Sequence, residues 1–149
     1  WLVVSVVGAG FVAAALIAAA LGTMLADREP PVRIDAAYVV SPEVLVGGEL
    51  VIRYKVHRAK QCHTTFTRVW RDSVGHRAVQ SWMHEPGADK PGEDTYNSPI
   101  PVPVTIDPGS VVVTQVMAYR CNLVHYLWPI VVPPREFRFR LVEAVETPG

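Results

Sequence analysis

The chain has 149 residues, half of them hydrophobic, and its fourteen basic and fourteen acidic side chains cancel to a formal net charge of zero. This balance gives no reason to expect nucleic acid as a partner, because nucleic-acid binding depends on an excess of positive charge. An apolar stretch at the N-terminus leaves about 120 residues, enough for one domain with its own core.

Residues 1–26 contain no charged side chain and are predicted to form a transmembrane helix. At about 1.5 Å per residue they would reach roughly 39 Å, more than the ~30 Å hydrocarbon core of a bilayer. A cleaved signal peptide is the alternative, but its apolar core is usually ~7–15 residues, and Met24 and Ala26 make a poor cleavage site. We therefore expect a single-pass anchor.

Small residues recur at every fourth position of this predicted anchor. They are Gly10, Ala14, Ala18 and Gly22. Such a ridge lets helices approach closely in lipid, so the anchor is expected to pack on itself or on another membrane protein. An alanine-rich helix also produces such a ridge by chance, and both interpretations stay open. The linker at 27–31 has no positive excess, which favours a non-cytoplasmic domain, periplasmic or extracellular.

Residues 32–145 alternate between hydrophobic and polar side chains and are interrupted by frequent turn signals, a pattern typical of an all-β sandwich. Phe66 and Trp70 are expected in the core. Pro101 and Pro103 favour a sheet edge, because proline cannot donate to a β-ladder. Residues 85–97 are predicted to be a loop and 146–149 a tail. The seven predicted strands cover 32–40, 50–57, 62–71, 77–84, 100–106, 111–121 and 137–141.

Tyr119-Arg120-Cys121 resembles the Tyr-x-Cys end of an immunoglobulin F strand, and Cys62 lies 59 residues upstream. The layout is similar to that of single-pass membrane proteins with an immunoglobulin-like β-sandwich ectodomain, of bacterial or phage type. The resemblance implies an immunoglobulin-like sandwich of about seven strands. The chain departs from the family in placing Cys62 at the start of the third strand. The resemblance implies no activity.

Cys62 and Cys121 are predicted to lie at the same end of two neighbouring antiparallel strands, within reach of a disulfide. One disulfide would also suit an oxidising compartment. The rival interpretation is a metal or redox site in which Cys62, His63, Cys121 and His125 supply two thiolates and two imidazoles. Neither half has the tight cysteine spacing of zinc motifs. The disulfide is therefore favoured, and no metal or other cofactor is expected.

The connection that follows Cys121 is unusually apolar for a link between strands. Its prominent side chains are Leu123, Tyr126, Leu127 and Trp128. An exposed apolar patch with tyrosine and tryptophan is typical of a protein-binding surface. The alternative is that the segment folds back and fills the end of the sandwich. The two are equally consistent with the pattern, and we predict partner binding at these four residues.

Charge is locally uneven, with seven basic residues and one acidic residue between Arg53 and Arg77. One hypothesis is a basic face that meets phosphate groups. The other, which we favour, is a solvated strand face balanced by the acidic segment that follows. We recognise no nucleophile elbow and no carboxylate pair placed for acid–base chemistry, so an enzyme is not expected.

These patterns predict a membrane-anchored, non-enzymatic β-sandwich protein that binds or stabilises a partner in an envelope, membrane-complex or virion assembly. The expected partners are the lipid bilayer and another membrane or envelope protein, with self-association through the anchor as a further option. Nucleic acid is not expected, and no small-molecule substrate is identified. The alternative function is the metal-binding or redox domain described above.

Overall fold

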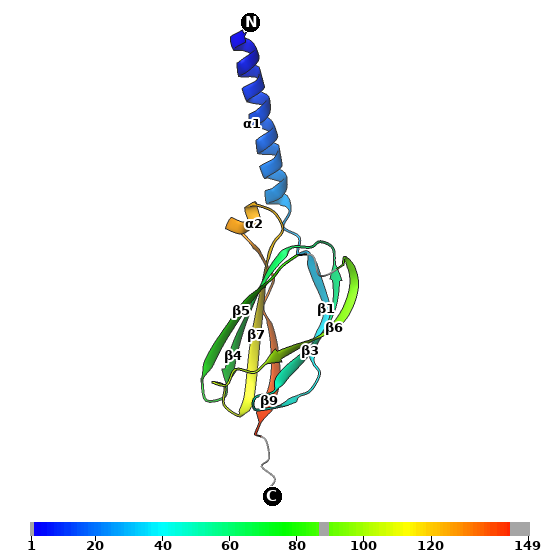
Figure 1. The fold of residues 1–149 in the computed structure, drawn as a ribbon, viewed down its shortest axis with the longest axis vertical. Helices are drawn as coiled ribbons and strands as arrows, with labels where there is room; N and C mark the ends of the chain where they lie inside the picture. The colour runs from blue at the N-terminus through cyan, green and yellow to red at the C-terminus, as the bar shows by residue number, and fades with distance from the viewer. Residues whose placement is uncertain (1, 87–89, 144–149) are drawn as a thin grey trace, which may run out of the picture.

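The computed structural model describes residues 2–86 and 90–143, with side chains from residue 10 onward. The predicted tail at 146–149 lies outside these residues. Within them the chain is mostly β, with nine strands and two helices. Figure 1 shows a two-layered β structure with one long helix projecting from one end and β9 finishing at the other.

The helices and strands follow one another along the chain in a simple order, with one helix before the strands and one between them. They are α1 (Leu2–Ala26), β1 (Val32–Val39), β2 (Glu43–Leu45), β3 (Glu49–Arg58), β4 (His63–Asp72), β5 (Arg77–His84), β6 (Gly92–Pro101), β7 (Gly109–Arg120), α2 (Val124–Leu127), β8 (Ile130–Val131) and β9 (Arg135–Val142).

The strands form two sheets that pack face to face. The smaller sheet has three strands in the order β1-β3-β6, and the larger has six, in the order β2-β9-β7-β4-β5 with β8 paired to β7. The short β2 pairs with β9 in parallel, whereas the remaining pairs are antiparallel. Each sheet therefore buries one face against the other, and β5 and β6 are edge strands.

The prediction of an N-terminal transmembrane helix is wrong. In the part of the chain that the structure describes, no helix has the length and apolar character needed to cross a membrane. The fold class is corrected to an N-terminal helix followed by a mostly β domain. The single-pass, membrane and phage assignments lose their support with it.

Two strand predictions also differ from the structure. The segment 92–97, predicted as loop, belongs to β6, whereas 103–106 is a turn closed by the Ile106 N–H, which donates to the Pro103 carbonyl. β6 pairs with β3 along its whole length. As an edge strand it exposes most of its side chains, so its acidic and polar residues hide the alternation that marks a half-buried strand. The described chain also contains nine strands where about seven were expected.

The main core lies between the two sheets around Trp70. Its indole packs edge-on against Phe139, with ring centroids 6.2 Å apart, and its Nε1 donates to the Gln80 side chain. Aliphatic residues from both sheets complete this cluster, including Leu50 of the smaller sheet and Val113 of the larger. A second, smaller core cluster contains Met117, Tyr119 and Ile130. The core therefore consists of two clusters that lie at different positions along the strands.

Candidate functional site

The segment after Cys121 exposes the four residues that were predicted to bind a partner. Leu123 is 76%, Tyr126 55%, Leu127 92% and Trp128 59% exposed. They lie on or beside α2 and are called the end surface below. The neighbouring His125 is fully buried. The segment therefore anchors itself by a few inward residues and presents the others to solvent.

Hydrogen bonds fix the shape of this segment from within. The Cys121 backbone N–H donates to Nδ1 of His125 at 3.2 Å, and the His125 backbone N–H donates to the Asn122 side-chain oxygen at 3.1 Å. Ile130 is buried and pairs with Tyr119 through β8. A short helix of one turn has little stability of its own, so these contacts hold α2 in place.

The end of α1 is fastened to the same segment. The Asn122 side chain donates to the Met24 carbonyl at 3.2 Å. Arg28 donates to the Trp128 carbonyl at 2.7 Å, and its guanidinium lies 4.1 Å from the centre of the Trp128 ring. Figure 1 shows α1 and α2 together at one end of the sheets. The predicted ridge of Gly10, Ala14, Ala18 and Gly22 is exposed along α1, and its role in helix pairing stays a prediction.

The two cysteines are joined to each other. Cys62 and Cys121 form a disulfide with a Cα–Cα distance of 4.6 Å. Sulfurs in a disulfide are not thiolates and cannot supply the ligands of the alternative metal site. Its two histidines have other partners, since Nδ1 of His63 lies 3.1 Å from a Glu85 carboxylate oxygen and His125 is held as described above. The metal and redox alternative therefore has no support from this geometry.

One group of potential metal ligands does occur among the described residues: Asp72, His76 and Asp107. One oxygen of Asp72 accepts the backbone N–H groups of Val74, Gly75 and His76, and the other accepts that of Asp107. Burial raises the pKa of Asp72, but these backbone donors outweigh it and hold the pKa below its ordinary value. The carboxylate is thus already committed to joining two turns, and we treat the group as structural.

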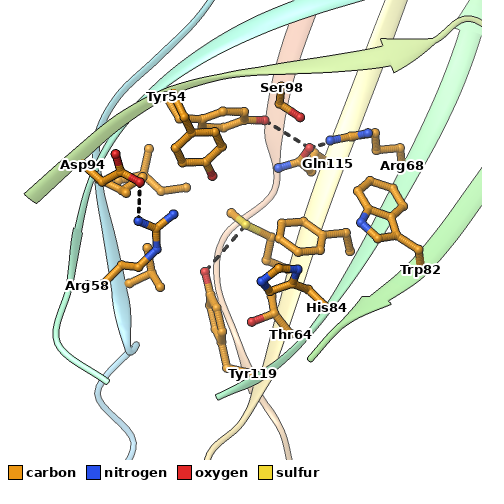
Figure 2. Close-up of a pocket in the computed structure, with 16 residues that line it drawn as sticks. Tyr54, Arg58, Thr64, Arg68, Trp82, His84, Asp94, Ser98, Gln115 and Tyr119 are labelled. Atoms are coloured by element: carbon orange, nitrogen blue, oxygen red, sulfur yellow. Dashed lines mark hydrogen bonds and ion pairs between the residues drawn. The ribbon is translucent and has the colours of Figure 1, made fainter. Parts of the chain in front are cut away.

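A cavity of about 400 Å³ lies between the sheets, toward the end that carries α1 and α2. Its lining comes from β1, β3 and β6 of the smaller sheet and from β4, β5 and β7 of the larger. Figure 2 shows side chains from both sheets pointing into it, with Asp94 on one side and Trp82 on the other. This site was not predicted from the sequence.

The most unusual group in the cavity is Arg68, which is only 5% exposed. Its Nε donates to the Gln115 side-chain oxygen at 2.8 Å, and its guanidinium lies 4.1 Å from the centre of the Trp82 ring. Among the described residues no carboxylate forms an ion pair with it. Burial therefore lowers the pKa of Arg68, and the hydroxyl of Tyr54 offsets this only in part.

The second arginine of the cavity, Arg58, is compensated. It donates to a carboxylate oxygen of Asp94 at 2.6 Å and lies 5.3 Å from the centre of the Tyr96 ring. This hydrogen bond from Arg58 is the main reason that the pKa of Asp94 is held below its ordinary value. Arg58 and Arg68 thus line the cavity. The charge pattern of the sequence had instead favoured a solvated strand face for the basic residues of this region.

Two tyrosines add hydroxyl groups to the cavity. The Tyr54 hydroxyl donates to Gln115 at 3.1 Å. Within the described chain the Tyr119 hydroxyl has only the Met117 sulfur, a weak acceptor, at 3.6 Å. Burial raises the pKa of Tyr54, and it raises the pKa of Tyr119 to about 12, so both groups stay protonated at neutral pH. The cavity therefore combines an uncompensated cation, hydroxyl donors and apolar walls.

A signal for this site does exist in the sequence. Phe66, Arg68 and Trp70 are spaced by two, so if the first and last face the core, the arginine between them must face it too. Gln115 occupies the equivalent position on β7, where it is paired with Arg68. An inward-facing arginine opposite an inward-facing glutamine marks a place where the core is not fully apolar.

No protein-family model matches the chain, and no curated protein matches it. Among solved structures it is similar to the Pseudomonas fluorescens alkylpurine DNA glycosylase AlkC bound to DNA containing an abasic site analogue, with a TM-score of 0.46 and 16% identity over 83% of this chain and 33% of that one. It is also similar to Spo0M, a sporulation control protein from Bacillus subtilis, with a TM-score of 0.37 and 14% identity over 79% of this chain and 51% of that one. The chain spans only a third to a half of these structures, and the likeness is too low to support an argument about function.

Proposed function

We propose that this protein is a non-enzymatic binding module that holds a protein partner through its end surface. The observation that carries the proposal is the exposure of Leu123, Leu127 and Trp128 on one short segment. Apolar side chains gathered in this way are typical of protein-binding surfaces. Tyrosine and tryptophan, both present in this segment, are the residues that most often dominate the energy of such interfaces.

The way the segment is held also supports this proposal. The disulfide at Cys121, the buried ring of His125 and the contact between Arg28 and Trp128 all fix α2 to the rest of the molecule. A surface that is ordered before binding loses less conformational entropy when the partner docks. A patch left exposed by accident would not need this support.

The disulfide further supports an oxidising compartment, periplasmic or extracellular, as the place where the protein acts. Cysteines of a protein in a reducing cytosol are usually kept as thiols. We therefore propose a role as a structural or accessory component of an assembly in such a compartment.

Site-specific photo-crosslinking tests the proposal. A photo-reactive residue replaces Leu127 in the full chain, expressed in the cells that make the protein. Val104 is the matched control, since it is apolar, 94% exposed and lies beyond the Pro101 end of β6, away from α2. We expect a defined protein adduct from position 127 and none from position 104. The change Trp128→Ala should weaken that interaction by about 2 kcal/mol or more, as for an interface hot spot.

Equal adducts from positions 127 and 104 would show nonspecific contact and contradict the proposal. Absence of an adduct at position 127 would contradict it as well. Circular dichroism of Trp128→Ala checks that the loss of binding does not come from unfolding. Because this side chain is more than half exposed, its removal should leave the fold intact.

A further inference from the structure

The cavity between the sheets has the size and composition of a binding site. Its volume of about 400 Å³ falls within the ~300–1,000 Å³ usual for small-molecule pockets. Val56, Phe66 and Met117 supply apolar walls from both sheets. Protein cores seldom contain voids larger than a water molecule, so a space of this size is unusual as a packing defect.

The edges of the sheets provide a way in. β5 and β6 belong to different sheets and lie at the end of each, so within the described strands no ladder of hydrogen bonds joins them. Trp82 on β5 and Asp94 on β6 stand on the two sides of the cavity in Figure 2. A small molecule can therefore reach the cavity without any change in strand pairing.

The charge of the cavity is incomplete. Arg58 is neutralised by Asp94, whereas no carboxylate among the described residues pairs with the buried Arg68. Burial of an uncompensated charge is costly, and proteins normally place a counter-ion beside it. The cavity thus holds one positive charge in excess and the space for a group that would balance it.

We propose that this cavity binds a small carboxylic acid with an apolar body, whose carboxylate pairs with the guanidinium of Arg68. A single excess charge calls for a monoanion. The planar guanidinium matches the two oxygens of a carboxylate. The inference does not depend on the end surface.

The remaining groups of the cavity fit the two parts of such a ligand. Phe66 and Trp82 stack at 5.1 Å between ring centroids and form an aromatic wall for the apolar body. The Tyr119 hydroxyl, directed into the cavity in Figure 2, has only a sulfur partner among the described residues and is available to donate to the ligand. Trp82 also covers one face of the Arg68 guanidinium and so favours approach of the anion at its edge.

Binding of decanoate to the full chain, measured by isothermal titration calorimetry, tests the proposal. Decan-1-ol is the uncharged control, and decyl phosphate tests the alternative anion. We expect decanoate to bind more tightly than either. Arg68→Gln should weaken decanoate at least about tenfold, as for the loss of a charged hydrogen-bond partner, and should leave decan-1-ol nearly unchanged. The matched control is Arg53→Gln, an exposed arginine on β3 that does not line the cavity.

The site is checked independently in the unmodified protein, in case Arg68→Gln does not fold. The chain has three methionines, and only Met117 lines the cavity. With carbon-13 methyl labels, decanoate should shift the NMR signal of the Met117 methyl group. The signal of Met83, which is exposed on β5, should stay in place.

Four results would overturn the proposal. They are equal affinity of decanoate for the parent and a folded Arg68→Gln, equal affinity of decanoate and decan-1-ol, tighter binding of decyl phosphate, and a Met117 signal that does not respond or moves together with Met83. Each of them leaves the partner proposal for the end surface untouched, because the two tests use different residues.

Discussion

The two ends of the space between the sheets differ sharply in what fills them. Around Trp70 the space is packed with aliphatic and aromatic side chains, and we call this the packed end. Around Arg68 it holds a cavity, and we call this the cavity end. The change occurs between successive inward positions, two residues apart on each strand. Trp70 is paired with Val113 on β7, and Arg68 is paired with Gln115.

β4 and β7 are paired at both ends, whereas β9 pairs with β7 only at the packed end, as far as Gln115. The side chains at successive inward positions differ as well. Apolar residues at the packed end bring the favourable free energy of burial, whereas Arg68 and Gln115 reduce it at the cavity end. Natural proteins commonly give up stability where they bind something. One end of the sandwich therefore supplies stability, and the other is left to serve a ligand.

The largest effect is expected at the packed end. Trp70→Ala should lower the free energy of unfolding by about 3–5 kcal/mol, since it removes a fully buried indole and leaves a void. Urea unfolding followed by circular dichroism measures this. Trp82→Ala at the cavity mouth is the control and should cost clearly less, because Trp82 is partly exposed. Equal costs at the two positions would break the distinction between the ends.

The stability of the cavity end should depend on the disulfide, because this end lacks a densely packed core. Cys62 and Cys121 lie next to the cavity strands β4 and β7. The bond closes a loop with a sequence separation of 59 residues, and its removal in the double change Cys62→Ala and Cys121→Ala should cost about 4 kcal/mol in the chain-entropy model. Urea unfolding checks the magnitude, with reductant-treated parent protein as the control. A double variant as stable as the oxidised parent would contradict this.

Arg68→Met should change the free energy of unfolding by less than about 1 kcal/mol, or should raise it. The substitution loses a hydrogen bond to Gln115 but removes an uncompensated buried charge, and such exchanges are often neutral or stabilising. Gln115 keeps the Tyr54 hydroxyl as a donor. Urea unfolding measures the change. A loss of about 3 kcal/mol or more, on the scale of a core truncation, would mean that Arg68 is a structural residue and that the two ends are alike.

The smallest effects are expected from pH, and acid and base should act on opposite ends. At the packed end, the pKa of Asp72 is held below the 3.8 of an unfolded chain. Its contribution to stability is therefore fully present above that value and is lost as the pH falls through the lower, folded pKa. Asp72→Asn should flatten the decline in urea midpoint below about pH 4. An unchanged acid slope in this variant would argue against the role assigned to Asp72.

At the cavity end the sign is reversed. Burial raises the pKa of Tyr119 from 10.0 to about 12, so its contribution is present below pH 10 and is lost as the pH rises from there toward 12. Tyr119→Phe should reduce the loss of stability in this range, measured by the same urea midpoints. Asp72→Asn should leave the loss of stability at alkaline pH unchanged, and Tyr119→Phe should leave the loss at acid pH unchanged. An effect of either variant in the other pH range would mean that the two ends do not titrate separately.

Several elements could be predicted because their signals are local. Residues 77–84 coincide with β5, and 62–71 nearly coincide with β4, since alternation and the Asp72–Gly75 turn chemistry mark them. Gly75 has a φ of 102°, a conformation that favours glycine, which explains its place in that turn. By contrast, β6 was missed at 92–97, because an exposed edge strand tolerates polar residues on both faces.

The two candidate sites, the end surface and the cavity, also differ in whether the sequence revealed them. The end surface was visible as Leu123, Tyr126, Leu127 and Trp128, because apolar residues in a connection stand out against the usual polar composition. Arg68 was overlooked because a basic residue in a run of basic residues suggests a solvated face. Only its spacing between Phe66 and Trp70 pointed inward.

The amino-acid sequence by itself determined the β-rich pattern, the order of most strands, and an apolar surface after the second cysteine, because each of these depends on neighbours along the chain. The tertiary structure alone decided that β5 and β6 are edge strands of different sheets, that a cavity lies between the sheets, and that Arg68 lies inside it while Asp94 compensates only Arg58. Period-two alternation tells which face a side chain takes, but not what stands opposite it. That depends on how two sheets, formed from distant segments, are brought together.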